Sequence, residues 1–179
     1  VNIITIPTRT GYTFNGWYPA IPESMPAENI TLVAQWKVNE YKIKFDTAGG
    51  TKVDDITAEF GSAISEPTEP TKEGHTFIGW DTKFPEKMGS EDITLTAQWK
   101  VNQYTIKFDT DGGTEIDAIT QDYGTAITAP ENPVKEHHEF LGWNIEIPDT
   151  MQANDITITA QWKYVYTGWL DEEGGTTYL

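Results

Sequence analysis

Four carboxylates surround a pair of glycines, an arrangement that resembles the loops in which calcium binds. They are Asp109, Asp111, Glu115 and Asp117, on either side of Gly112-Gly113. Calcium prefers flexible loops that offer several carboxylate oxygens. However, the order of these residues lacks the EF-hand pattern, and a similar segment before Gly49-Gly50 has Ala48 in the place of Asp111. The sequence therefore favours a solvated acidic turn over a metal site.

His137 and His138 are the other adjacent residues of a metal-binding type. Neighbouring side chains on an extended segment point in different directions, and no third ligand is spaced to join them. We expect neither a metal ion nor a cofactor.

Recurring tryptophans are the best candidates for contact with a ligand, because an aromatic face is a large and rigid surface. One series follows glycine at a constant interval along the chain. In a strand over His75–Trp80, Ile78 and Trp80 would share one face, opposite Phe77. The candidate ligand-facing aromatics are Trp17, Trp80, Trp143 and, in the tail, Trp169.

The sequence lacks recognisable catalytic motifs. It contains no cysteine, which excludes a thiolate nucleophile and a Cys-ligated zinc. It also lacks Gly-x-Ser-x-Gly, the phosphate-binding loop and Gly-x-Gly-x-x-Gly. Consecutive carboxylates such as Asp54-Asp55 face opposite sides of a strand and cannot flank one bond. We expect a protein that is not an enzyme.

The charge balance narrows the range of partners. The 179 residues include 28 Asp and Glu against 12 Lys and Arg, a formal net charge of -16. Nucleic acids and anionic membrane surfaces would repel such a chain, so neither is an expected partner. The aromatic residues, 12% of the chain, argue against disorder. We expect no membrane insertion, because the apolar runs are short, and residues 1–7 do not form a signal peptide.

An internal repeat, at a period of about 63 residues, positions all of these side chains. Residues 41–100 and 104–163 align without gaps and are identical at 33 of 60 positions. Residues 1–37 match residues 64–100 at 19 of 37 positions, so the chain reads as a fragment that opens part-way through an earlier copy. The predicted divisions are 1–37, the C-terminal part of an incomplete first repeat; 38–100, the second repeat; 101–163, the third repeat; and 164–179, a tail.

The local pattern within a repeat predicts strands and almost no helix. Tyr104, Ile106 and Phe108 alternate with polar residues, and the Gly–Gly pair after them suits a hairpin whose return strand runs towards Tyr123. Prolines then favour an extended crossover, with at most a short helical turn around Gly61–Ser65.

Two further strands complete the predicted repeat. His75–Trp80 is the third, and Ile93–Lys100 gives the cleanest alternation of the repeat. In this last strand Trp99 shares the apolar face with Leu95 and Ala97, which predicts that its ring packs in the core.

Successive repeats are joined by short links without flexible composition. Only Lys100, Val101, Asn102 and Gln103 separate Trp99 from Tyr104. Such a link restrains the orientation of neighbouring modules, and it predicts an elongated, semi-rigid rod.

The third repeat holds the pattern Tyr104-x-Ile106-x-Phe108-Asp109, Gly112-Gly113, Tyr123-Gly124, Pro130, Pro133, Phe140-x-Gly142-Trp143, Met151 and Asp155-Ile156-Thr157-x-x-Ala160-Gln161-Trp162. This pattern resembles the Listeria–Bacteroides repeat, the B-repeat family of internalin-like surface proteins. The resemblance implies a β-rich α+β fold of tandem ubiquitin-like β-grasp modules. It also implies a place in secreted or wall-attached proteins of Gram-positive and some other bacteria, as a stalk or accessory binding region without catalytic residues.

The tail departs from the repeat. Its Gly168-Trp169 and final Tyr178-Leu179 resemble the start of a choline-binding or cell-wall-binding repeat, although Thr176-Thr177 replace aromatic residues usual in that family.

These observations lead to two functional hypotheses. The first is a non-enzymatic extracellular stalk that presents an adhesive domain. The alternative is a module that binds a host protein or glycan through recurring aromatic patches. The incomplete first repeat is expected to expose sheet edges, so it would borrow strands from the tail or from a second molecule, by strand exchange or dimerisation, or be poorly ordered.

Overall fold

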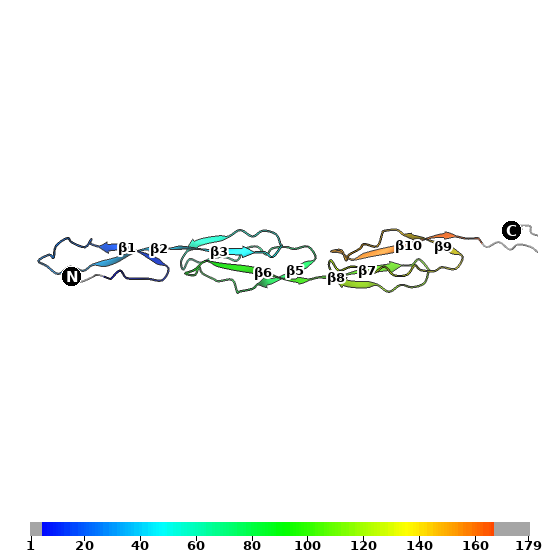
Figure 1. Ribbon diagram of the computed structural model, residues 1–179, viewed down its shortest axis with the longest axis horizontal. Helices are drawn as coiled ribbons and strands as arrows, with labels where there is room; N and C mark the ends of the chain where they lie inside the picture. The colour runs from blue at the N-terminus through cyan, green and yellow to red at the C-terminus, as the bar shows by residue number, and fades with distance from the viewer. Residues whose placement is uncertain (1–4, 167–179) are drawn as a thin grey trace, which may run out of the picture. The chain divides into compact units, whose positions relative to one another are not determined.

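A computed structural model describes residues 5–166, and this part of the chain consists of strands, turns and loops (Figure 1). The strands are β1 (Tyr12–Tyr18), β2 (Val33–Val38), β3 (Glu40–Asp46), β4 (Ile56–Glu59), β5 (His75–Trp80), β6 (Ile93–Val101), β7 (Gln103–Asp109), β8 (Ile119–Asp122), β9 (His138–Trp143) and β10 (Ile156–Tyr164). The β-rich expectation is confirmed. The helical part of the α+β expectation is wrong for residues 5–166, because the segment Gly61–Ser65 forms a turn and extended chain rather than a helical turn.

The chain divides into two compact units. Unit 1 comprises Val1–Lys72 with Phe77–Trp99, and unit 2 comprises Glu73–Thr76 with Lys100–Leu179. The two-stranded sheet β1–β2 lies in unit 1, and β7 to β10 lie in unit 2.

Each complete repeat forms one four-stranded mixed sheet. The order is β4-β3-β6-β5 in the second repeat and β8-β7-β10-β9 in the third. The first hairpin, β3–β4, is antiparallel. Its first strand then pairs in parallel with the last strand, with Ile43 opposite Ile93 and Phe45 opposite Leu95. Segments from the two ends of a repeat therefore meet at the centre of the sheet.

The core of each complete repeat is small and built from equivalent residues. Ile43, Met88 and Leu95 are buried together in the second repeat. Ile106, Met151 and Ile158 take the same places in the third. Two of the three come from the central parallel strands, and the methionine closes the core from a loop, where its flexible side chain fills an irregular gap.

Trp99 joins the last strand to the turn of the first hairpin. Its indole Nε1 donates a hydrogen bond of 2.9 Å to the carbonyl of Thr47. The ring occupies the space above Gly50, where an added Cβ would lie 2.6 Å from a ring carbon. The ammonium of Lys72 donates to the Ala48 carbonyl and lies 5.8 Å from the ring centre. Trp99 is half-buried and packs on this turn, outside the buried cluster of Ile43, Met88 and Leu95, so the expectation that its ring packs in the core is met only in part.

The same arrangement recurs in the third repeat. Trp162 Nε1 donates to the Thr110 carbonyl at 3.0 Å, and a Cβ on Gly113 would again lie 2.6 Å from the ring. The Gly–Gly pair of the sequence is thus required by a tryptophan as well as by the turn.

Within the described residues, the first repeat has two strands, which correspond to β5 and β6. β1 and β2 pair antiparallel, with Phe14 opposite Trp36, and the register shifts between Phe14 and Trp17. Several large apolar side chains remain exposed, namely Ile6, Tyr18, Ile21, Met25, Ile30 and Val33. The first repeat is therefore a two-stranded ribbon that leaves several apolar side chains exposed.

Candidate functional site

The predicted ligand-facing tryptophans pack on phenylalanine more closely than the sequence indicated. Trp80 lies with its ring centre 4.9 Å from that of Phe45 and 5.3 Å from that of Phe77. Ile78 is instead 61% exposed. The expectation that Trp80 and Ile78 share a face opposite Phe77 is wrong, because Gly79 adopts φ = 116° and interrupts the alternation.

The counterparts of Trp80 have similar neighbours. Trp143 packs at 5.3 Å from both Phe108 and Phe140, and Trp17 lies 5.4 Å from Phe14. All three tryptophans are half-buried. Trp169 lies outside the described residues.

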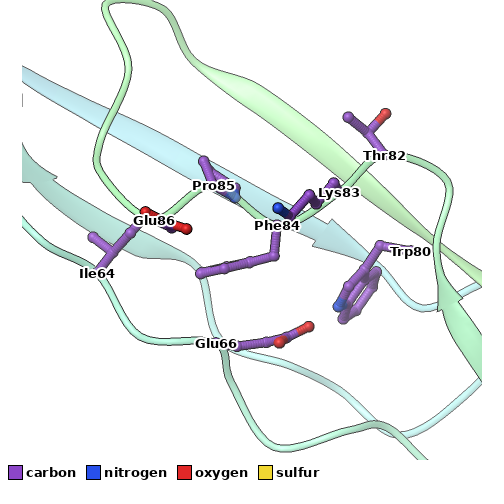
Figure 2. A pocket seen from close by; sticks show the side chains of 8 residues that line it. All are labelled: Ile64, Glu66, Trp80, Thr82, Lys83, Phe84, Pro85 and Glu86. Carbon is purple, nitrogen blue, oxygen red and sulfur yellow. The ribbon is translucent and has the colours of Figure 1, made fainter.

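A hollow of about 360 Å³ opens beside Trp80 (Figure 2). It is lined by Ile64, Glu66, Trp80, Thr82, Lys83, Phe84, Pro85 and Glu86. These residues come from the loop after β4, from the end of β5 and from the segment that follows it. In Figure 2 the Glu66 side chain extends towards the Trp80 ring, and Phe84 lies between the two loops.

Backbone hydrogen bonds hold the two loops together. Ile64 N donates to the Glu86 carbonyl at 3.2 Å, and Met88 N donates to the Ser62 carbonyl at 2.9 Å. Asp81, directly after Trp80, exchanges hydrogen bonds with Thr96 through its backbone and its carboxylate. The two loops are therefore fixed to each other, and Asp81 fixes the segment after Trp80 to β6.

The chemistry of the hollow suits weak polar and stacking contacts. Two aromatic side chains, two carboxylates and one ammonium surround it, and the three charged side chains, Glu66, Lys83 and Glu86, are exposed. Carboxylate and ammonium groups hydrogen-bond to hydroxyls, while an indole edge or face packs on apolar surface. None of the lining residues is a serine, cysteine or histidine that would serve as an activated nucleophile or imidazole base.

The hollow is not repeated chemically. In the third repeat, Ala129, Ile145 and Glu146 stand where the second repeat has Glu66, Thr82 and Lys83. A smaller hollow there is lined by Glu146, Ile147, Pro148 and Asp149. The candidate residues were found in the sequence by their recurrence from repeat to repeat, and this signal does not reach Glu66, Lys83 and Phe84.

The acidic turn has a local structural role. Asp109 accepts a hydrogen bond of 3.0 Å from the Asp111 amide, and Asp46 accepts the equivalent bond of 2.9 Å from Ala48. The turn is thus the same whether the next residue is Asp111 or Ala48. Among residues 5–166, no group of three or more His, Cys, Asp or Glu side chains is placed to hold a metal ion.

The structure holds no helix within residues 5–166 of the length and apolarity needed to cross a membrane.

Comparison with known families identifies the repeat. The profile of the Listeria–Bacteroides repeat domain matches residues 1–35, 41–98 and 104–163. The chain belongs to this family. The matches in the two complete repeats begin at equivalent residues, Tyr41 and Tyr104, and the resemblance read from the sequence is confirmed.

The curated relatives of this chain are longer than the chain itself. A putative membrane protein of Evansella cellulosilytica is 37% identical over 89% of this chain and 28% of its own length. Internalin H of Listeria monocytogenes is 40% identical over 55% of this chain and 21% of its own length. The chain thus spans less than a third of the curated relatives it matches.

A solved structure of streptococcal high identity repeats in tandem (SHIRT) domains 3–4, from a cell surface protein, is also similar. It covers 72% of this chain and 99% of its own length, at 16% identity and a TM-score of 0.26.

Proposed function

We propose that this chain is part of a non-enzymatic stalk in an extracellular bacterial surface or secreted protein, which holds an adhesive domain away from the cell. The observation that carries the proposal is a docked contact between the first and second repeats in unit 1. The Phe60 ring packs directly on Gly11, and the Asn39 amide donates to the Gly11 carbonyl at 2.9 Å. A stalk needs such contacts because flexible links would let the repeats collapse.

The lengths of the links support the same proposal. Only Asn39 separates β2 from β3, and only Asn102 separates β6 from β7. Asn39 uses its carbonyl to accept from the Phe60 amide at 2.8 Å, so the single linking residue is itself held. The net charge of -16 keeps such a chain soluble and disfavours sideways pairing of sheet edges.

The order of strands supports a β-grasp relationship for each repeat. In the third repeat the two central strands are parallel and each has one antiparallel neighbour, and the second repeat has the same strand order. We infer that each full repeat, with its period of about 63 residues, is one β-grasp-like module with an extended segment in the place of a helix.

Small-angle scattering over a concentration series tests the stalk. Three modules in line, each about 30–35 Å long, are expected to give a radius of gyration of roughly 27–30 Å. A compact chain of this length would give about 16 Å. The elongated, concentration-independent value supports a stalk, whereas the compact value contradicts it.

The second candidate function is binding of a host protein or glycan, and the observation that favours it is the shaped hollow beside Trp80. An array of glycans and surface proteins tests it. Binding that is lost on Trp80→Ala and retained on Trp143→Ala would assign the ligand to the second repeat. Loss in both variants would instead favour the recurring aromatic patches, with avidity across repeats. If nothing on the array binds, the stalk remains the proposed function.

We also propose that the first repeat, if left open, exchanges strands or dimerises through its exposed edge. The unpaired side of β2 and the apolar residues beside it support this proposal. Sedimentation at increasing concentration is expected to show a dimer, and a monomer at all concentrations contradicts it. The wall-binding reading of residues 164–179 stays a prediction, since all but the first three lie outside the described residues.

A further inference from the structure

The contact between Gly11 and Phe60 is repeated, with the same geometry, by Gly74 and Tyr123. An ideal Cβ on Gly11 would lie 2.2 Å from Phe60 ring carbons, and one on Gly74 would lie 2.1 Å from Tyr123 ring carbons. Carbon atoms do not approach each other so closely, so any side chain at either glycine would expel the ring. Gly74 and Tyr123 both belong to unit 2, and Gly11 and Phe60 to unit 1.

Backbone hydrogen bonds around the two rings also correspond. In unit 2, the Asn102 amide donates to the Gly74 carbonyl at 2.9 Å, and the Tyr123 amide donates to the Asn102 carbonyl at 2.9 Å. The asparagine thus bridges the glycine and the aromatic residue, as Asn39 does in unit 1.

Side chains complete the arrangement in the same way. Thr13 Oγ1 donates to Asn39 Oδ1 at 2.6 Å, and Thr76 Oγ1 donates to Asn102 Oδ1 at 2.6 Å. We call glycine, threonine and asparagine at these places the receiving set. The arriving residue is the aromatic, Phe60 or Tyr123.

The third repeat has a different set at the corresponding places, where His137, Glu139 and Val165 replace glycine, threonine and asparagine. The backbone is nevertheless the same. The Val165 amide donates to the His137 carbonyl at 2.8 Å, and His137 adopts φ = 57° against 76° and 67° at the two glycines.

His137 is an internal control for the role of the glycines. A residue with a side chain at positive φ is uncommon and costs energy, yet this turn forms around one. The turn alone therefore does not require glycine. What Gly11 and Gly74 provide and His137 does not is the empty space that an aromatic ring fills.

We propose that the receiving set encodes docking of one repeat onto the next, and that His137 ends the docked series at the third repeat. A further copy of this repeat does not dock there, because His137 has a Cβ at the place where a Cβ on Gly11 or Gly74 would lie 2.2 or 2.1 Å from ring carbons. The inference extends the proposed stalk, but it concerns the local contact and holds whether or not the whole chain presents an adhesive domain.

Reciprocal substitutions in the full chain test whether the receiving set determines docking. Gly74→His is expected to expel the Tyr123 ring and to speed hydrogen exchange of the Tyr123 and Asn102 amides by at least about tenfold. His137→Gly should leave both rates unchanged. Tyr123→Ala should speed exchange as Gly74→His does, and adding Gly74→His to Tyr123→Ala should have no further effect, because the ring has already gone. Unchanged hydrogen-exchange rates in Gly74→His, or additive effects in the double variant, would contradict the proposal that the receiving set determines docking.

A chain with one inserted repeat tests whether His137 prevents a further repeat from docking on the third. A copy of residues 101–163 placed between Lys163 and Tyr164 brings its own asparagine to the place of Val165. Distances between spin labels on the third and inserted repeats are expected to be broadly distributed with His137 and narrow after His137→Gly with Glu139→Thr. A narrow distance distribution with His137 in place would contradict the proposal that His137 prevents docking. A broad distribution after both substitutions would show that the receiving set is not sufficient for docking. Small-angle scattering of the unmodified chain tests the stalk proposal separately, so either proposal can be contradicted without the other.

Discussion

Met25 and Met88 hold equivalent places in the first and second repeats, and their exposures are opposite. Met25 is 93% exposed, whereas Met88 is 2% exposed, as is Met151 at 1% in the third repeat. The two segments are related, since residues 1–37 and 64–100 are identical at 19 of 37 positions, although Ser24 and Pro26 stand where the second repeat has Lys87 and Gly89. The two methionines also differ in their neighbours, because Met88 is buried in a cluster with Ile43 and Leu95.

Within residues 5–166, no hairpin equivalent to β3–β4 pairs with the first repeat. In the second repeat, β3 pairs with β6 from Ile93 onwards, and Met88 packs on Ile43 from that strand. In the first repeat, Ile30 corresponds to Ile93, but β2 begins only at Val33. The first residues of the last strand thus become a strand when a parallel partner is present. The core and the length of this strand depend on the same hairpin.

The largest expected effect comes from shortening the two methionines. Met88→Ala removes a buried side chain and leaves a cavity, which is expected to cost about 2–5 kcal/mol of unfolding free energy. Met25→Ala removes an exposed side chain and should change stability by less than about 0.5 kcal/mol. Urea unfolding, with hydrogen exchange of β6 amides to locate the loss, measures both. Equal effects of the two variants would mean that the first repeat has a closed core in solution.

A second effect should follow from filling the space below Trp99. Gly50→Ala places a Cβ 2.6 Å from the ring, and the indole must leave its bond to Thr47, at an expected cost of about 1–3 kcal/mol. Gly89→Ala is the matched control, because a Cβ there meets no atom within 4 Å. Urea unfolding midpoints compare the two, and an equally stable Gly50→Ala variant would show that the indole moves freely.

A smaller effect should reach the first repeat through its contact with the second. Tyr12 and Phe60 lie edge to face, with ring centres 6.0 Å apart, and Phe60 also covers Gly11. Phe60→Ala should weaken β1–β2 by about 1–2 kcal/mol, since this ribbon lacks a core of its own. Hydrogen exchange in Thr13–Tyr18 reports the loss. Tyr123→Ala is the control, and it should leave these amides as they are.

The strands were predictable from the sequence, but the face of β5 on which Trp80 lies was predicted wrongly. His75–Trp80 and the hairpin around Gly112-Gly113 were predictable because alternation and turn residues are local signals. The direction of Trp80 was not, because Gly79 leaves the regular strand conformation and alternation cannot show it. Glu66 and Lys83 beside Trp80 were also missed, because two loops bring them together and neither recurs in the third repeat.

The docking aromatics provide the subtlest comparison, since Tyr123 carries a hydroxyl and Phe60 does not. Burial raises the pKa of Tyr123 above the ordinary 10.0, and the nearby Glu73 carboxylate raises it further. The docked state therefore favours the neutral phenol. Its stabilising contribution is complete below pH 10 and is lost as the pH rises through the ordinary value and the higher pKa of the folded chain.

Carbon NMR of the labelled Tyr123 ring should give a pKa above 10.0 that falls towards the ordinary value in Gly74→His, where the ring is displaced. Thermal unfolding between pH 9 and 11 should decline more steeply for the unmodified chain than for Tyr123→Phe, which docks a ring that does not titrate. The contact of Phe60 with Gly11 should show no such dependence. A pKa of Tyr123 that is the same in the unmodified chain and in Gly74→His would mean that the surroundings of the ring do not depend on Gly74.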